Sequence, residues 1–183
     1  EAVIAMLLDP QVMRFLGPRR ALAEDEADSW FEAALANPAR FAVANADTDE
    51  FIGFCGIKQI DGDPDFGYFI RSEFWGNGIA AKACELVVER LSHEIDLETV
   101  QVFIADDNLA SQRVAQKLGW QATHSGSKDG EYGQYYRITR RSTGHQKRIA
   151  FGSLRWRSGA GYLRVISQGY GNFLVVGCMG LGG

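Results

Sequence analysis

The sequence is poor in cysteine, with three residues in 183, and has no long hydrophobic run. Cys55, Cys84 and Cys178 lie far apart, without metal-ligand spacing or an even count. This argues against a disulfide scaffold and against a zinc site, and Cys84 reads as a small buried hydrophobe. No segment approaches the roughly 18 apolar residues of a membrane helix, and the start lacks the basic residues of a secretory signal. We therefore predict a cytoplasmic protein with reduced thiols, no metal and no membrane contact.

Acidic residues are absent from the last part of the chain. Residues 142–183 carry five basic residues and no acid, whereas residues 1–141 carry 23 acids against 14 Lys and Arg. The same last 42 residues hold ten of the 21 glycines. This change predicts a domain over 1–141 followed by a Gly-rich basic extension. Three readings of the extension stay open: a poorly ordered segment, which we favour, an accessory β-segment, or a basic arm for an acidic partner. Five basic residues are too sparse to indicate nucleic-acid binding.

The first 141 residues show alternating helix-like and strand-like patterns. They predict a mixed α+β fold, in which helices flank a mixed, mostly antiparallel sheet. A chain of this length is expected to form one domain with a sizeable core. The predicted helices cover 1–8, 11–16, 23–36, 79–91 and 108–118, and the predicted strands cover 41–44, 51–60, 66–71, 99–105, 120–124 and 132–139.

A glycine-rich loop, Trp75-Gly76-Asn77-Gly78-Ile79-Ala80, lies between a predicted strand and an amphipathic helix. Small residues there let backbone N–H groups approach a ligand, and the helix N-terminus adds partial positive charge. The loop thus suits a pyrophosphate, although a plain tight turn fits it equally. No Gly-Lys-Ser/Thr follows, which excludes a P-loop, and Ala81 stands where a dinucleotide fingerprint needs its third glycine.

A second motif, Asn108-Leu109-Ala110-Ser111, opens a helix directly after a predicted buried strand. Asn108 is a good N-cap, and capping alone would explain it. The stretch through Gly119-Trp120 is more specific than a cap requires. Together with Gly67-Tyr68, Trp75-Gly76-Asn77-Gly78 and Lys117-Leu118-Gly119-Trp120, in this order, it resembles the GNAT superfamily of N-acetyltransferases. Within the superfamily, the sequence is similar to the branch of ribosomal-protein N-terminal acetyltransferases, over roughly residues 1–141.

The resemblance implies direct transfer of the acetyl group from acetyl-CoA to an amine, without an acyl-enzyme and without a metal. A backbone N–H of Phe69, Ile70 or Arg71 would serve the oxyanion, and the glycine loop would hold the pyrophosphate. Asn108 would bond the pantetheine. The residues implied to bind acetyl-CoA are Phe69, Ile70, Arg71, Trp75, Gly76, Asn77, Gly78, Ile79, Ala80, Asn108 and Ser111.

Two side chains are candidates for proton chemistry. Asp65 is the candidate general base, where the family branch has the longer Glu; alternatively, it only ends a turn. Ser111 is the candidate general acid at the sulfur, but serine in a first helical turn often serves local hydrogen bonding. Tyr135 and Tyr136 are candidates for the acceptor site, although adjacent strand residues face opposite ways.

The sequence departs from the family at both ends. The family begins with a strand before its first helix, whereas this chain starts inside that helix, so we expect the first family strand to be absent. The extension after Ser142 has no counterpart in the family pattern. Two alternatives to catalysis therefore stay open, a GNAT-like acyl-CoA-binding module and a nucleotide-phosphate binder. The expected acceptor is a primary amine of a protein N-terminus or a small molecule, and the chain is expected to be a monomer or homodimer.

Overall fold

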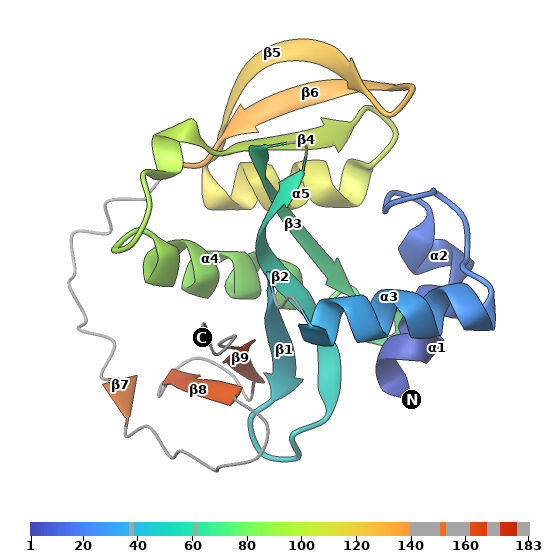
Figure 1. Ribbon diagram of the computed structural model, residues 1–183. Coiled ribbons are helices and arrows are strands. Elements are labelled where there is room, and N and C mark those ends of the chain that lie inside the picture. The colour runs from blue at the N-terminus through green and yellow to red at the C-terminus, as the bar shows by residue number, and fades with distance from the viewer. Residues whose placement is uncertain (37–38, 61, 140–150, 153–161, 168–172, 179–183) are drawn as a thin grey trace.

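The computed structural model describes residues 1–36, 39–60 and 62–139, together with the backbone of three short strands near the C-terminus (Figure 1). The protein has the predicted mixed α+β fold, and among the described strands only one pair, β3 with β4, is parallel. The helices are α1 (Ala2–Leu8), α2 (Pro10–Met13), α3 (Glu24–Ala36), α4 (Ile79–Leu91) and α5 (Leu109–Leu118). The strands are β1 (Phe41–Asn45), β2 (Phe51–Ile60), β3 (Asp63–Ile70), β4 (Gln101–Ala105), β5 (Gln121–Lys128), β6 (Glu131–Arg137), β7 (Phe151–Gly152), β8 (Tyr162–Ser167) and β9 (Phe173–Cys178).

Local hydrogen bonds explain where several helices begin and end. The Asp9 carboxylate accepts from the Gln11 N–H at 2.8 Å and caps α2, whose first residue is Pro10. Helix α5 starts after Asn108 and ends at Gly119, which adopts the left-handed conformation at φ +74°. Glycine takes this conformation without the steric cost that a Cβ would add.

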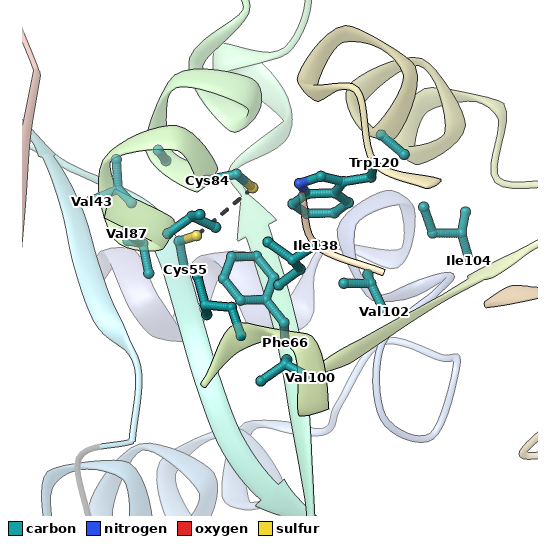
Figure 2. Close-up of a cluster of buried hydrophobic side chains, with 14 of the residues drawn as sticks. Val43, Cys55, Phe66, Cys84, Val87, Val100, Val102, Ile104, Trp120 and Ile138 are labelled. Carbon is teal, nitrogen blue, oxygen red and sulfur yellow. Dashed lines mark hydrogen bonds between the residues drawn. The ribbon is translucent and has the colours of Figure 1, made fainter. Parts of the chain in front are cut away.

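Helices cover both faces of the sheet, and each face has its own buried cluster. Helices α4 and α5 pack on one face around Val87, Ala115 and Phe66 (Figure 2). Helices α1 to α3 pack on the other face, around Leu7, Ala27 and Phe69. The two faces are called the α4–α5 face and the α1–α3 face below.

The two cysteines whose side chains the structure describes are buried. Cys55 on β2 and Cys84 on α4 are free thiols with their sulfur atoms 3.9 Å apart. Burial raises the pKa of the Cys84 thiol well above its ordinary value, which keeps it protonated. Cys84 is therefore the inert packing residue that the sequence predicts.

Within the described residues, most of the β3 edge that faces β4 is unpaired, and this unpaired edge is called the opening between β3 and β4 below. Strand β3 pairs antiparallel with β2 from Asp63 opposite Ile60 to Ile70 opposite Gly53. Its pairing with β4 is limited to a single register position, Asp65 opposite Gln101. Beyond this pair, the edge of β3 that faces β4 has no strand partner within the described residues.

The outer edge of β1 is paired with a strand of the extension. Strand β9 runs antiparallel to β1, with Ala42 opposite Val176 and Asn45 opposite Phe173. The sheet order is β5-β6-β4-β3-β2-β1-β9-β8-β7. The domain boundary near Ser142 stays a prediction, because residues 140–150 lie outside the described residues. In the described part of the chain, no helix has the length and apolar character needed to cross a membrane.

Candidate active site

The glycine loop is held in shape by two side chains of its own. The Trp75 indole N–H donates to the Ile70 carbonyl at 2.7 Å, although the ring is half exposed. The Asn77 amide donates to the Phe74 and Trp75 carbonyls at 3.2 and 3.1 Å. Gly76 stands at φ +79°, and a Cβ there would meet no atom within 4 Å. The backbone conformation, and not a close neighbouring atom, therefore explains the glycine at this position.

The loop ends in a set of free N–H groups. The first hydrogen bond of α4 is donated by the Lys82 N–H to the Gly78 carbonyl at 3.2 Å. The N–H groups of Ile79, Ala80 and Ala81 therefore lack intrahelical partners. A Cβ on Gly78 would lie 3.3 Å from the Lys117 ammonium, so a cation from α5 reaches this loop. These groups together suit an anion such as a pyrophosphate.

Of the three residues at the end of β3 that are predicted to serve an oxyanion, Phe69, Ile70 and Arg71, one presents its N–H to the opening. The Arg71 N–H donates to the Ile52 carbonyl at 2.9 Å, which places it on the β2 side. Antiparallel alternation then assigns the Phe69 N–H to β2 as well, and the Ile70 N–H to the opposite edge. The Trp75 indole, which reaches the Ile70 carbonyl, agrees with this assignment.

Asp65 lies on the α1–α3 face and forms two ion pairs. Its two oxygens accept from Arg40 at 3.2 Å and from Lys128 at 2.5 Å. The side chains of Asp65 and Arg40 are only 19% and 14% exposed. Salt therefore screens the attraction in these ion pairs less than it would between charges at an open surface. Asp65 is thus fixed in place rather than a free carboxylate at the end of a turn.

Arg40 reaches Asp65 by lying over two glycines. A Cβ on Gly56 would lie 3.2 Å from the Arg40 backbone, and one on Gly67 would lie 3.1 Å from its guanidinium. The guanidinium also lies over the Phe69 ring, 5.2 Å from its centroid. Burial lowers the pKa of Arg40, and the Asp65 charge opposes this shift. Sequence patterns gave no sign of Arg40 or of Lys128 at this site.

Ser111 lies on the α4–α5 face, opposite Asp65. Its backbone N–H donates to the Asn108 carboxamide oxygen at 3.1 Å, so Asn108 caps α5 in this structure. Tyr68 on β3 packs against the buried cluster of the same face, and its hydroxyl is buried without a hydrogen bond to any described residue. The two candidates for proton chemistry therefore lie on opposite faces of the sheet.

Comparisons with known proteins identify the family of the chain. The family model described as "Acetyltransferase (GNAT) domain" matches residues 1–121. The chain belongs to the GNAT acetyltransferase family. It is 28% identical over 129 residues to the uncharacterized N-acetyltransferase YoaA of Bacillus subtilis, covering 66% of this chain and 73% of that protein. It is also 28% identical over 85 residues to the uncharacterized N-acetyltransferase p20 of Bacillus licheniformis, covering 45% of this chain but only 48% of that protein.

The likeness extends to solved GNAT structures. The acetyltransferase (GNAT family) of Bacillus anthracis superposes with a TM-score of 0.63 at 18% identity, covering 74% of this chain and 84% of that one. At this identity, the likeness establishes the fold. The chain thus carries an acetyltransferase domain of the GNAT family, a family that uses acetyl-CoA.

Only one of the two predicted acceptor-site tyrosines of this GNAT domain faces the side of Asp65. The Tyr135 ring stacks on His124 at 4.6 Å and lies 5.1 Å from Phe103, on the α1–α3 face. Tyr136 packs against the buried cluster of the α4–α5 face. The strand alternation separates the pair, as expected.

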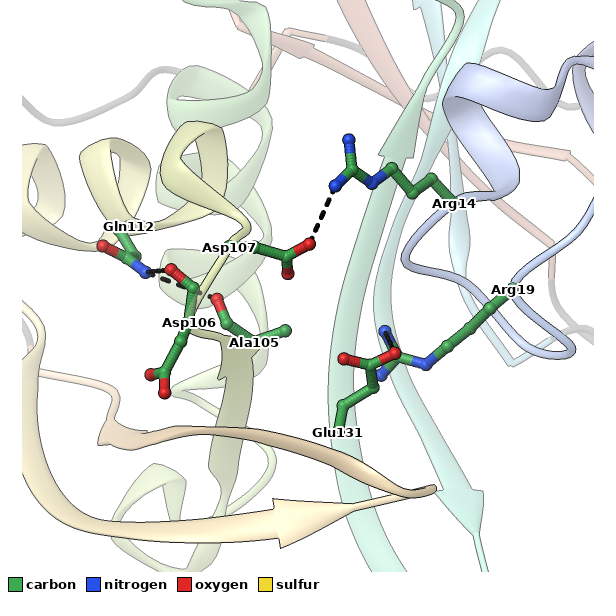
Figure 3. A network of polar contacts seen from close by, with 7 residues as sticks. All are labelled: Arg14, Arg19, Ala105, Asp106, Asp107, Gln112 and Glu131. Atoms are coloured by element: carbon green, nitrogen blue, oxygen red, sulfur yellow. Dashed lines mark hydrogen bonds and ion pairs between the residues drawn. The ribbon is translucent and has the colours of Figure 1, made fainter.

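Two ion pairs connect the N-terminal helices of the GNAT domain to the far side of the opening (Figure 3). Arg14 pairs with Asp107, after β4, at 2.8 Å. Arg19 pairs with Glu131, at the start of β6, at 3.7 Å. These ion pairs attach the segment between α2 and α3 to the end of β4 and to the start of β6.

Proposed function

We propose that this GNAT domain transfers the acetyl group of acetyl-CoA directly to a primary amine of a protein N-terminus or a small molecule. The observation that carries the proposal is the opening between β3 and β4. It has a fixed carboxylate, Asp65, on one face and a hydroxyl, Ser111, on the other. An amine and a thioester approaching from opposite faces would meet at this opening, next to the Ile70 N–H.

The residues at the opening fit acetyl-CoA. The free N–H groups of Ile79, Ala80 and Ala81 and the Lys117 ammonium match a pyrophosphate. The Tyr68 hydroxyl is buried and forms no hydrogen bond to any described residue, so a polar group of the ligand can serve as its hydrogen-bond partner. When bound, acetyl-CoA supplies an activated acyl group with a thiolate as the leaving group.

The chain's own groups then have separate tasks. The Ile70 N–H is aimed at the edge where the thioester oxygen gains negative charge, which is where a fixed donor accelerates acyl transfer. Asp65 takes the proton that the amine loses, directly or through water. A carboxylate has about four lone-pair sites, so the contacts with Arg40 and Lys128 leave room for another donor.

A second candidate is a GNAT-like module that binds acyl-CoA without catalysis. The observation that favours it is the double pairing of Asp65, because both oxygens already accept from a cation. In this reading, Asp65 fixes Arg40 and Lys128 and takes no proton. The cytoplasmic setting and the ribosomal-protein branch remain predictions from the sequence.

One experiment separates the two candidates. The protein is incubated with acetyl-CoA and a panel of amines that includes short peptides, free amino acids and polyamines, and released thiol is measured. We expect thiol release that depends on an amine, together with thermal stabilisation by CoA. Stabilisation without release on any amine would favour the binding module, and the absence of stabilisation would refute both candidates.

A further inference from the structure

Lys128 places a primary amine of the chain itself at the candidate base. Its ammonium lies 2.5 Å from Asp65 Oδ1, while Arg40 pairs with the other oxygen of the carboxylate at 3.2 Å. The proposed acceptor is also a primary amine, and it needs a position beside the same carboxylate to lose its proton. The contact between Lys128 and Asp65 is therefore the contact that an acceptor amine would make.

Lys128 reaches Asp65 across the opening between β3 and β4. It is the last residue of β5, and the sheet order places β6 and β4 between β5 and β3. Three strand spacings measure about 14 Å on a flat sheet, which is more than a lysine side chain spans. The β5–β6 hairpin therefore bends toward β3 on the α1–α3 face, and this bend brings the Lys128 ammonium to the opening.

Backbone contacts hold the tip of this hairpin in place. Asp129 and Gly130 form a two-residue turn with positive φ at both positions, +52° and +81°, which is the geometry of a tight hairpin. The Asp106 N–H, after the end of β4, donates to the Tyr132 carbonyl at 3.0 Å. The backbone of Lys128 is thus held on the β4 side of the opening, whereas its ammonium lies on the β3 side.

Of the two cations that pair with Asp65, Lys128 is the freer one. Arg40 is 14% exposed and is enclosed by two glycines and an aromatic ring. Lys128 is 31% exposed, and its ammonium stands on a flexible four-carbon stem. The Lys128 nitrogen can therefore turn from Asp65 toward the Ile70 N–H, where the proposed function places the thioester oxygen, while its backbone stays in position.

We propose that Lys128 is a self-acetylation site, whose Nζ takes the acetyl group of acetyl-CoA when no other amine is present. This inference rests on the proposed function. The ammonium first loses a proton to Asp65 or to water. The nitrogen then forms a bond to the acyl carbon, the carbon–sulfur bond breaks, and the electron pair of that bond stays on sulfur. The nitrogen loses a second proton as the amide forms, and the thiolate takes one up, so the products are acetyl-lysine, CoA and one free proton.

Acetylation of Lys128 would change the candidate base as well. An acetyl-lysine carries no positive charge, so it no longer forms an ion pair with Asp65. Asp65 would keep its ion pair with Arg40, and its other oxygen would become available to an incoming amine.

The experiment incubates the full chain with acetyl-CoA alone and locates acetyl groups by peptide mass spectrometry over time. Lys58 is the matched control, because it is exposed, lies directly opposite Asp65 on β2 and forms no ion pair with Asp65 within the described residues. We expect Lys128 to be acetylated at least about tenfold faster than Lys58, since proximity makes the transfer unimolecular. For the same reason, the rate should not depend on the protein concentration. Lys128→Arg keeps a positive charge beside Asp65 and should remove the acetyl group from this position.

Two controls separate an enzymatic from a purely chemical acetylation. Desulfo-CoA occupies the CoA site without offering a thioester, so it should slow the acetylation of Lys128 in the wild type and leave that of Lys58 unchanged. This control needs no variant and is independent of any effect of a substitution on folding. Asp65→Asn, with its thermal unfolding compared with that of the wild type, should slow the acetylation of Lys128 by about 10²–10⁴-fold, the contribution of a general base.

The outcomes keep this inference apart from the proposed function. Turnover of an added amine by a wild type whose Lys128 stays unmodified would overturn self-acetylation and leave acetyl transfer intact. Equal acetylation of Lys58 and Lys128, or acetylation of Lys128 that neither desulfo-CoA nor Asp65→Asn slows, would show a purely chemical reaction and also overturn it. A wild type that neither binds CoA nor releases thiol would refute the proposed function, and this inference with it.

Discussion

Replacing Arg40 by methionine tests whether its largely buried ion pair with Asp65 holds the side chain of this candidate base in place. Methionine keeps much of the apolar stem of Arg40 and removes the charged guanidinium that lies over the Phe69 ring. Two unit charges 4 Å apart attract by about 4 kcal/mol at an effective dielectric constant near 20. The pair between Arg40 and Asp65 joins its atoms at 3.2 Å, so this value sets the scale.

Two features of the site reduce this attraction between Arg40 and Asp65. Lys128 also pairs with Asp65, so the carboxylate keeps one cation after the substitution. The Arg40 Nε is buried and lacks a hydrogen-bond partner among the described residues, and its removal recovers part of the desolvation cost. We therefore expect a coupling free energy of about 1–2 kcal/mol between Arg40 and Asp65.

A double-mutant cycle measures this coupling. Urea unfolding at pH 7 and 25 °C is compared for the wild type, Arg40→Met, Asp65→Asn and the double variant. The matched control is the pair of Arg14 with Asp107, whose side chains are 63% and 53% exposed. An exposed pair contributes about 0–1 kcal/mol. If the coupling at Arg40 is no larger than that at Arg14, the reasoning from burial is refuted.

Four further predictions follow from the same contacts. Asp65→Asn should lower kcat by about 10²–10⁴-fold, the usual contribution of a general base. CoA binding measured by calorimetry should stay nearly unchanged, and a variant with the full wild-type rate would show that Asp65 is not the base. Gly78→Val should weaken CoA binding by at least about tenfold, because a β-branched side chain is strained at φ +72° and meets the Lys117 ammonium; unchanged affinity would argue against the loop. Lys117→Met should weaken CoA binding by about 3- to 10-fold, with the difference shrinking at high salt; an equal affinity in both proteins contradicts the phosphate role. Glu26→Gln should destabilise the fold at neutral pH, because the Arg20 guanidinium and the Ala23 N–H lower the pKa of Glu26 to about 2. Since a lowered carboxyl pKa stabilises the folded state only above that pKa, the difference in urea midpoint should narrow between about pH 4.5 and pH 2; a difference that does not vary with pH contradicts the assignment.

Local patterns were sufficient for the elements that carry the glycine loop. Helix α4 runs over Ile79–Leu91, as its apolar spacing predicts, and Ala83, Cys84 and Val87 are fully buried. The Asn108 cap and the Gly119 terminus of α5 are also local signals, read directly from residue type. Each of these features depends on neighbours within a few positions.

Strand boundaries were predicted less well, because hydrogen bonds between distant residues decide them. The predicted strand from Thr99 begins at Gln101, since Asp96 caps a turn at Leu97–Thr99 by accepting from the Glu98 N–H at 3.0 Å. The predicted strand over 120–124 runs on to Lys128. Its last residues are polar and show no apolar alternation, so pairing with β6 rather than side-chain burial extends it.

The same cause hid two site residues. Lys128 reaches Asp65 only because β5 extends to its end, and the two residues are 63 positions apart in the chain. Arg40 reaches Asp65 because β1, β2 and β3 are neighbours in the sheet. Neither contact leaves a pattern in the sequence near Asp65, so a motif search finds the carboxylate and misses the cations around it.

The Gly67-Tyr68 pair shows why the order of residues on β3 matters to the chemistry. Gly67 shares a face with Asp65, and its missing side chain leaves room for the Arg40 guanidinium. Tyr68 points to the opposite face, where it packs against the buried cluster under α4 and α5. A shift of the register by one residue would exchange the two faces, placing the tyrosine against Arg40 and the carboxylate toward the α4–α5 core. The full pairing of β3 with β2 prevents this shift, so one strand presents a carboxylate to the α1–α3 face and a phenol to the α4–α5 face.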